Sequence, residues 1–229
     1  MPRRARMYIP GLPYHVVQRG NNREPCFIEP ENYLFYLELW KSLSEKYGVD
    51  VHAYCLMTNH IHFLVTPNTE TSLSTTMKVV GSRYAHYVNR KTKRTGTLWE
   101  SRHKASPVDA ENYLLLCSRY IELNPVKAKM VEFPSDYKWS SYCSNAEGIS
   151  NRIIESHELY KRLGKTCNER CESYKELFKN KYDCSEDEKI NKAVEFSVPT
   201  GDGIFKAQIE RMLGRKVGQA YRGRPRKIE

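Results

Sequence analysis

Two histidines separated by one residue are the first feature of the sequence with the means to do chemistry. His60 and His62 lie in the stretch MTNHIHFLVT, which is rich in residues that favour β-strands. Side chains two apart on a strand point to the same face, so both imidazoles can converge on one divalent cation while Ile61 points to the other face. An isolated pair of this kind is more often just two polar side chains at the end of a strand. Other residues must therefore provide further evidence for a metal site.

Tyr120 and Asn124 supply a candidate nucleophile and a candidate third ligand. They are four residues apart in a helical pattern and therefore share one helical face. Two imidazoles and one amide oxygen leave open positions on a cation, as a catalytic site requires. A phosphodiester suits this set, because the cation polarises phosphorus and the tyrosine oxygen can attack it. Tyr113, seven residues earlier on the same face, is the rival nucleophile, and a packed aromatic ring is the alternative for any of the 16 tyrosines.

Positive charge is concentrated in two segments of a chain whose formal net charge is +10. Residues 78–104 hold eight basic residues against Glu100, and residues 206–229 hold eight against Glu210 and Glu229. Such clustering favours a polyanionic partner over an evenly solvated surface, and nucleic acid is the usual one. In the first segment aromatic rings lie among the basic side chains, which suits backbone contacts combined with base stacking. The candidate DNA contacts there are Arg83, Arg90, Lys91, Lys93, Arg94, Trp99 and Arg102.

Both ends of the chain carry further candidate DNA contacts. The N-terminal stretch offers Arg3, Arg4 and Arg6, which can reach DNA as an arm. Near the C-terminus, RGRPRK has the form of an AT-hook, in which an extended Gly-Arg-Pro core lays arginines in a narrow minor groove. Its candidate contacts are Arg222, Arg224 and Arg226, and a generic charged tail is the alternative.

The elements that must position these residues follow from hydrophobic periodicity and turn residues. We expect a strand at 14–19, a helix from 30 to 47, strands at 49–57 and 60–65, a helix from 72, a strand within 96–108 and a helix from 109 to 124. This order predicts an α+β fold of the ferredoxin-like kind, with an antiparallel sheet and helices on one face. Short helical patterns around 155–163, 172–180, 185–196 and 203–213 predict a small C-terminal helical module. We therefore expect two domains, 1–145 for the chemistry and 146–229 as a helical DNA-binding appendage with a basic tail.

Three stretches, in this order, resemble a known family: MTNHIHFLV, GTLWESRHKASPV and RYIELNPVKAKMV. They are similar to the single-tyrosine HUH transposases, and within these to the REP-associated tyrosine transposases, relatives of the IS200/IS605 enzymes. The resemblance runs from about Tyr8 to Tyr142, and Ile61 takes the place of the hydrophobic residue between the two histidines. The family's nucleophile matches Tyr120 and its third metal-binding position matches Asn124, where many relatives have Gln.

The resemblance implies an HUH nuclease fold and cleavage and rejoining of single-stranded DNA with Mg²⁺ or Mn²⁺. It implies a 5′-phosphotyrosine intermediate, a free 3′-OH, and substrates that fold as hairpins like the palindromic REP sequences. Two alternatives stay open: a rolling-circle replication initiator or relaxase, and a regulator that binds DNA without cutting it. Whether the protein acts as a monomer or a homodimer is also open.

The cysteines and the lack of long apolar runs are the features of the sequence that bear on cellular location. The seven cysteines are scattered and odd in number, and the sequence has no run of apolar residues of transmembrane length. We expect a cytoplasmic, nucleoid-associated bacterial protein with reduced thiols and no membrane partner.

Overall fold

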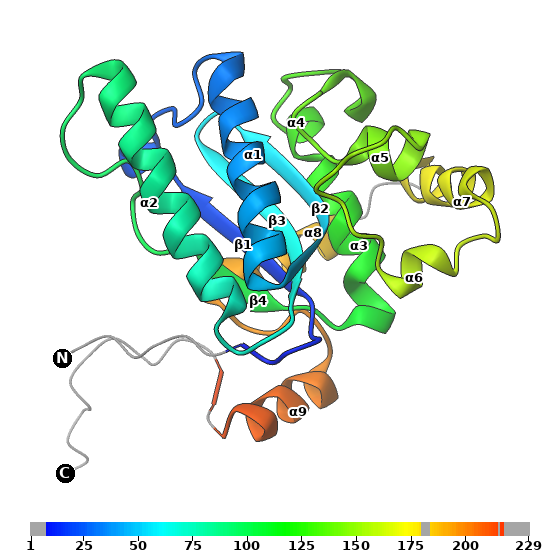
Figure 1. Ribbon diagram of the computed structural model, residues 1–229. Helices are drawn as coiled ribbons and strands as arrows, with labels where there is room; N and C mark the ends of the chain where they lie inside the picture. Colours follow the sequence, from blue (N-terminus) through cyan, green and yellow to red (C-terminus); the bar gives the residue numbers. More distant parts are fainter. Residues whose placement is uncertain (1–7, 180–183, 215, 218–229) are drawn as a thin grey trace, which may run out of the picture.

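A four-stranded antiparallel sheet forms the centre of the computed structural model, which describes residues 8–179, 184–214, 216 and 217 (Figure 1). The strands are β1 (Tyr14–Arg19), β2 (Val49–Met57), β3 (His60–Pro67) and β4 (Lys104–Pro107), in the order β2-β3-β1-β4. The α+β class and the antiparallel sheet predicted from the sequence are therefore confirmed. Of the expected strand within 96–108, only β4 is extended, at the edge of the sheet.

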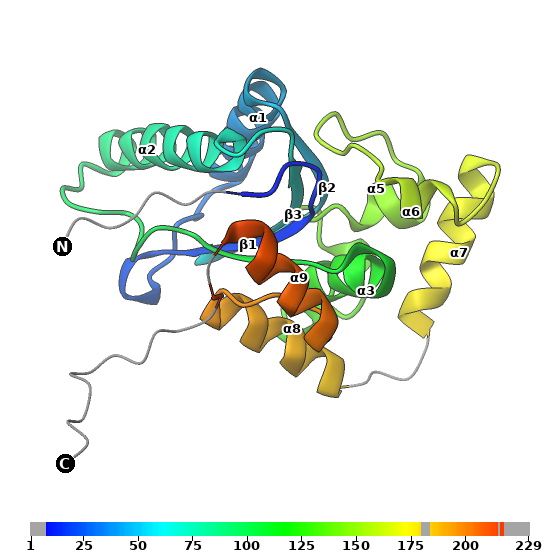
Figure 2. The same cartoon turned by 90° about the horizontal axis from the view of Figure 1, so that it is seen from below.

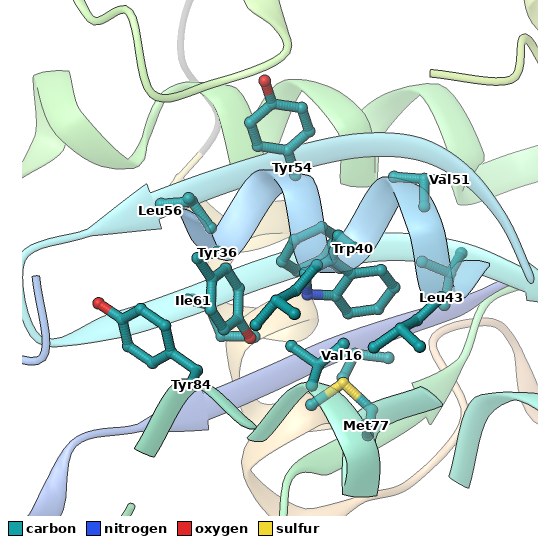
Figure 3. Close-up of a cluster of buried hydrophobic side chains, with 14 of the residues drawn as sticks. Val16, Tyr36, Trp40, Leu43, Val51, Tyr54, Leu56, Ile61, Met77 and Tyr84 are labelled. Carbon is teal, nitrogen blue, oxygen red and sulfur yellow. The ribbon is translucent and has the colours of Figure 1, made fainter. Parts of the chain in front are cut away.

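Two helices, α1 (Pro30–Tyr47) and α2 (Ser72–Thr92), cover one face of the sheet. Proline at the first position and Gly48 in the left-handed region just beyond Tyr47 bound α1, as helix-end chemistry favours. The core between helices and sheet is aromatic: Trp40 stacks on Phe63 with ring centroids 4.0 Å apart, and Tyr36 and Tyr84 pack beside them (Figure 3). This layer holds the apolar side of β3, including Ile61.

The third helix, α3 (Ala110–Glu122), packs against the opposite face (Figure 2). We expected the helices on one face, so this detail differs from the prediction. The reason is that β2 and β3 also bury apolar residues on the second face, among them Cys55 and Leu64, and these need a cover. The helix α8 (Cys184–Phe196) contributes Ile190 to the same layer. The second layer is where the histidines of β3 point.

The chain after α3 continues with short elements. They are α4 (Asn124–Lys127), the 3-10 turn η2 (Pro134–Asp136), α5 (Tyr142–Glu147), α6 (Glu158–Lys161), α7 (Cys167–Lys179) and α9 (Gly203–Leu213). A further 3-10 turn, η1 (Asn21–Arg23), lies between β1 and α1. Of the helices that the structure describes between 142 and 213, α6, α7, α8 and α9 were predicted approximately, and α5 was not. Among the described residues no helix has the length and apolarity that crossing a membrane demands.

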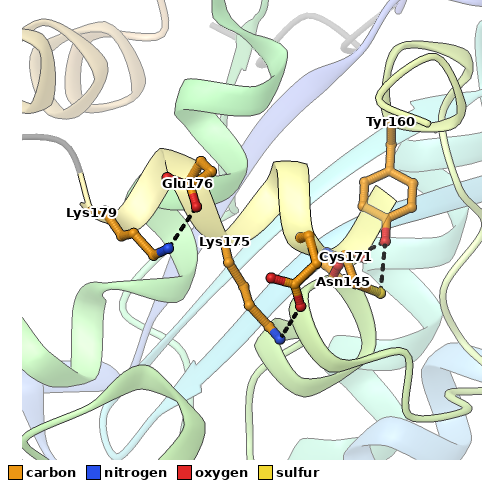
Figure 4. A network of polar contacts seen from close by, with 7 residues as sticks. Asn145, Tyr160, Cys171, Lys175, Glu176 and Lys179 are labelled. Atoms are coloured by element: carbon orange, nitrogen blue, oxygen red, sulfur yellow. Dashed lines mark hydrogen bonds and ion pairs between the residues drawn. The ribbon is translucent and has the colours of Figure 1, made fainter. Parts of the chain in front are cut away.

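Residues beyond 146 pack onto the sheet and onto α3. The Glu155 amide donates to Val51 O at 2.8 Å, and Thr200 pairs with Val108 beside β4. The Tyr160 hydroxyl donates to Asn145 O, across the expected boundary, at 2.7 Å and lies 3.8 Å from Cys171 Sγ, next to ion pairs along α7 (Figure 4). Close contacts therefore join the two sides of the expected boundary at 145/146, and that boundary stays a prediction.

Candidate active site

The two histidines of β3 lie side by side on the α3 face of the sheet. Their ring centroids are 5.0 Å apart, with His62 buried and His60 half-buried. The strand alternation that sends Ile61 into the opposite core produces this arrangement. His60 Nδ1 lies 2.7 Å from Asn59 Oδ1, and because an amide oxygen only accepts, Nδ1 carries the proton. Its Nε2 then keeps a lone pair for a ligand.

A third histidine, which the sequence reasoning missed, completes the group. His15 of β1 is fully buried, and its Nε2 lies 2.9 Å from His62 Nδ1. The two rings are close to parallel, with centroids 5.2 Å apart. His15 shares a face with Val17, the residue that pairs with His62, but this register is set by the folded sheet and cannot be read from the strand alone.

Tyr120 is the tyrosine that the fold brings beside these histidines. Its ring centroid lies 5.7 Å from that of His15 and 6.0 Å from that of His62, and only 7% of the residue is exposed. Lys127 Nζ sits 4.0 Å from the Tyr120 ring centroid and pairs with Asp187 of α8 at 2.5 Å. Neither Lys127 nor Asp187 was expected at the site, since both reach it from elements outside α3.

Asn124 begins the short helix α4, directly after the end of α3. Its side-chain Nδ2 donates to the carbonyl oxygens of Tyr120 and Ile121 at 2.9 and 3.1 Å. The amide therefore caps the carbonyl end of α3, and these bonds leave its Oδ1 for other partners. The rival nucleophile, Tyr113, is half-buried and lines a cavity of about 290 Å³ together with Lys189 and Phe196 of α8.

Burial keeps the three imidazoles neutral at neutral pH. Burial lowers the pKa of His15 to about 3, and the positive charge of Lys127 adds a smaller effect. Burial likewise lowers the pKa of His60 to about 4, with a smaller effect from Arg19. The pKa of His62 lies well below its usual value, mainly through burial and then through the neighbouring histidines and Lys127. Neutral imidazole is the form that binds metal ions. Burial also raises the pKa of Tyr120, so the phenol holds its proton until something favours the phenolate.

These residues fit a divalent cation bound by imidazole nitrogens and an amide oxygen. Within the described ranges, no group of three or more His, Cys, Asp or Glu side chains is placed to hold a metal ion. The Asn124 oxygen predicted from the sequence stays the candidate for a third ligand beside His60 and His62. Nitrogen and amide-oxygen ligands with open positions are compatible with Mn²⁺ and Mg²⁺.

The candidate DNA contacts of the first basic segment lie on α2 and on the loop after it. Arg83, Arg90 and Lys91 border an open cavity of about 900 Å³ between α1 and α2. Trp99 and Arg102 border another of about 640 Å³ between α2 and the loop. Lys93 is exposed at the end of α2.

Some of these side chains already have partners within the protein. Lys91 pairs with Glu29, and Arg94 pairs with Glu24 at 3.4 Å. The Trp99 indole donates to Gly81 O at 3.0 Å, and its ring packs against the edge of the hydrophobic core. The six terminal arginines, Arg3, Arg4, Arg6, Arg222, Arg224 and Arg226, lie outside the described residues.

Comparison with known proteins points to one family. Residues 8–124 match the family described as "Transposase IS200 like". No curated protein matches the chain.

Among the solved structures similar to the chain are the following two. One is a REP-associated tyrosine transposase bound to a REP hairpin, with a TM-score of 0.54 and 18% identity over 69% of this chain and 93% of that one. The other is a presumed transposase from Deinococcus radiodurans R1, with a TM-score of 0.37 and 16% identity over 52% of this chain and 95% of that one. At this level of identity the first likeness shows a shared fold, and the second supports no argument.

Proposed function

Because the chain belongs to the family of IS200-like transposases, we propose that it cleaves and rejoins single-stranded DNA at hairpin sequences through a 5′-phosphotyrosine intermediate. The observation that carries the proposal is the position of Tyr120, with its ring centroid 6.0 Å from that of His62. A tyrosine beside neutral histidines places a nucleophile next to side chains that can bind the activating cation, which tyrosine attack on a metal-activated phosphodiester needs.

In this proposal His60, His62 and Asn124 hold Mg²⁺ or Mn²⁺. The cation, when bound, supplies charge that neutralises the phosphate and makes its phosphorus more electrophilic. Tyr120 Oη attacks phosphorus, the bond from phosphorus to the 3′-oxygen breaks, and the departing 3′-oxygen gains the proton that the phenol loses. The positive charge of Lys127 over the Tyr120 ring favours the phenolate that develops during attack, whereas the nearby carboxylate of Asp187, which pairs with Lys127, opposes it.

The DNA strand is proposed to reach this site along basic surfaces. Arg83, Arg90, Lys93 and Arg102 are exposed and can contact phosphates, and the terminal arginines add to them. The partner is single-stranded or hairpin DNA, in keeping with the hairpin bound to the solved transposase of similar fold. Monomer and homodimer are both compatible with this proposal.

A covalent-adduct assay tests the nucleophile. A hairpin oligonucleotide labelled at its 3′ end is incubated with the protein and Mn²⁺, because the 5′-phosphotyrosine keeps the 3′ part of the DNA. We expect a labelled adduct that resists denaturation and a released fragment that ends in a 3′-OH. Tyr120→Phe removes the attacking oxygen and should abolish the adduct, by at least about a thousandfold if tyrosine is the nucleophile.

Tyr113→Phe is the matched control and should leave the adduct yield unchanged. A full adduct yield from Tyr120→Phe would show that Tyr120 is not the nucleophile. A loss of adduct confined to Tyr113→Phe would identify Tyr113 as the nucleophile. Hairpin binding without an adduct under any metal condition would favour the non-cleaving regulator instead.

A further inference from the structure

His15 makes a contact that a residue with only a packing role does not need. It is fully buried in β1, where an apolar side chain would fill the same space at lower cost. Its Nε2 lies 2.9 Å from His62 Nδ1, and the near-parallel rings show that the two side chains are held together. The hydrogen bond between two imidazoles has consequences for which nitrogen of His62 can bind a metal ion.

A hydrogen bond between two neutral imidazoles requires one ring to donate and the other to accept. If His15 Nε2 donates, His62 Nδ1 is the acceptor and the proton of His62 sits on Nε2, which then has no lone pair for a cation. If His62 Nδ1 donates instead, His62 Nε2 is free to bind a cation. Only the second arrangement is compatible with His62 as a ligand through Nε2.

His60 already shows the same arrangement without His15. Its Nδ1 donates to Asn59 Oδ1 at 2.7 Å, which leaves Nε2 unprotonated. Both histidines therefore have a hydrogen-bond partner on Nδ1, one an amide oxygen and the other an imidazole nitrogen. Partners of this kind fix the orientation and tautomer of a metal-binding histidine.

We infer that His15 is a positioning residue for the metal site: its Nε2 accepts the Nδ1 proton of His62 and so directs His62 Nε2 to the cation. The inference rests on the proposed function in taking His62 as a ligand. In this arrangement the proton of His15 sits on Nδ1, a buried atom with no hydrogen-bond partner among the described residues. A buried N–H without a partner lowers the stability of the fold. The contact between His15 and His62 is therefore better explained by a role in metal binding than by a role in stability.

The test measures Mn²⁺ affinity directly, by titration calorimetry or by the free Mn²⁺ signal in electron paramagnetic resonance. His15→Leu removes the acceptor and should weaken Mn²⁺ binding by about 10- to 100-fold. His15→Gln places an amide oxygen near the position of Nε2 and should restore affinity to within about threefold of wild type. Circular dichroism and thermal unfolding check that each variant folds.

A second readout follows the tautomer itself. With diamagnetic Mg²⁺ bound, ring ¹⁵N shifts should place the His62 proton on Nδ1 in the wild type and in His15→Gln. In a folded His15→Leu variant the two tautomers of His62 should both be populated. A residue that only fills space would change neither the tautomer nor the Mn²⁺ affinity.

The outcomes separate this inference from the proposed function. If the wild type binds Mn²⁺, forms the Tyr120 adduct and loses binding in His62→Ala, but His15→Leu binds Mn²⁺ as tightly as wild type, only the inference fails. If His62 carries its proton on Nε2 in the metal-bound wild type, the inference fails in the same way. If the wild type binds no Mn²⁺, both the metal-dependent function and the role of His15 are wrong.

Discussion

At the scale of single residues, burial lowers the pKa of His52 as it does for the histidines of the candidate site. His52 of β2 is an example outside the candidate site: its Nδ1 contacts Glu155 O at 2.7 Å and its Nε2 contacts Thr66 Oγ1 at 2.8 Å. Burial lowers its pKa to about 4, although the Glu155 carbonyl opposes this shift. His52 thus joins β2, β3 and the segment after α5 as a neutral ring.

The pKa of His52 predicts how stability depends on pH. Because the folded-state pKa is depressed, the unfolded chain takes up a proton near pH 6.5 while the folded protein resists it until about pH 4. The stabilisation is therefore full above pH 6.5 and decreases as the pH falls, by ~3 kcal/mol at most. Urea unfolding of the wild type and His52→Gln at pH 7 and pH 4.5 should give a smaller pH effect in the variant. Equal pH effects would contradict the assignment.

At the scale of secondary-structure elements, a buried carboxylate anchors the helix that carries Tyr120. Glu122, fully buried near the end of α3, accepts hydrogen bonds from Ser141 Oγ at 2.5 Å, Asn145 Nδ2 at 2.8 Å and Tyr174 Oη at 2.8 Å. Burial is the main cause that raises the pKa of Glu122 to about 7, and the three hydrogen bonds oppose it. The network fixes α3 to α5 and α7.

We expect Glu122→Leu to lower the free energy of unfolding by ~2–4 kcal/mol, because three buried donors lose their acceptor. Glu122→Gln has the same shape and keeps an acceptor oxygen, so it should cost less than ~1.5 kcal/mol. Chemical denaturation of both variants at pH 7 measures the difference. A Leu variant as stable as the Gln variant would show that the network does not hold α3.

The elements were more predictable than their contacts. Alternation in β3 was enough to place His60 and His62 on one face and Ile61 on the other, because the period of a strand is fixed by its backbone. The four-residue spacing predicted Tyr120 and Asn124 on one face of a single helix, whereas α3 ends at Glu122 and Asn124 begins α4. His15, Lys127 and Asp187 were missed, because strand register and the packing of α4 and α8 depend on distant parts of the chain.

At the scale of the whole molecule, the positive charge is not all available to a DNA partner. Arg83 and Arg90 are exposed on α2, whereas Lys91 and Arg94 pair with Glu29 and Glu24. A paired cation that binds phosphate must first lose its carboxylate, so its net contribution to DNA binding is smaller.

Salt dependence of hairpin binding tests this difference. Arg83→Ala combined with Arg90→Ala should reduce the slope of log K against log salt concentration by about 1.5, as expected for two lost phosphate contacts. Lys91→Ala combined with Arg94→Ala removes the same formal charge and should change the slope by less than about half as much. Fluorescence anisotropy at several salt concentrations gives both slopes. Equal changes would show that the ion pairs with Glu24 and Glu29 open when DNA binds.

The way α3 ends has a consequence for the conformational entropy of Asn124. An asparagine side chain that is free in solution samples several rotamers and both amide orientations. Binding a cation in one of them costs conformational entropy. Here the bonds from Nδ2 to the carbonyls of Tyr120 and Ile121 have already made that selection during folding. If Asn124 binds the cation, it does so as a preorganised oxygen, and the same two bonds hold it at a fixed offset from the tyrosine four residues before it.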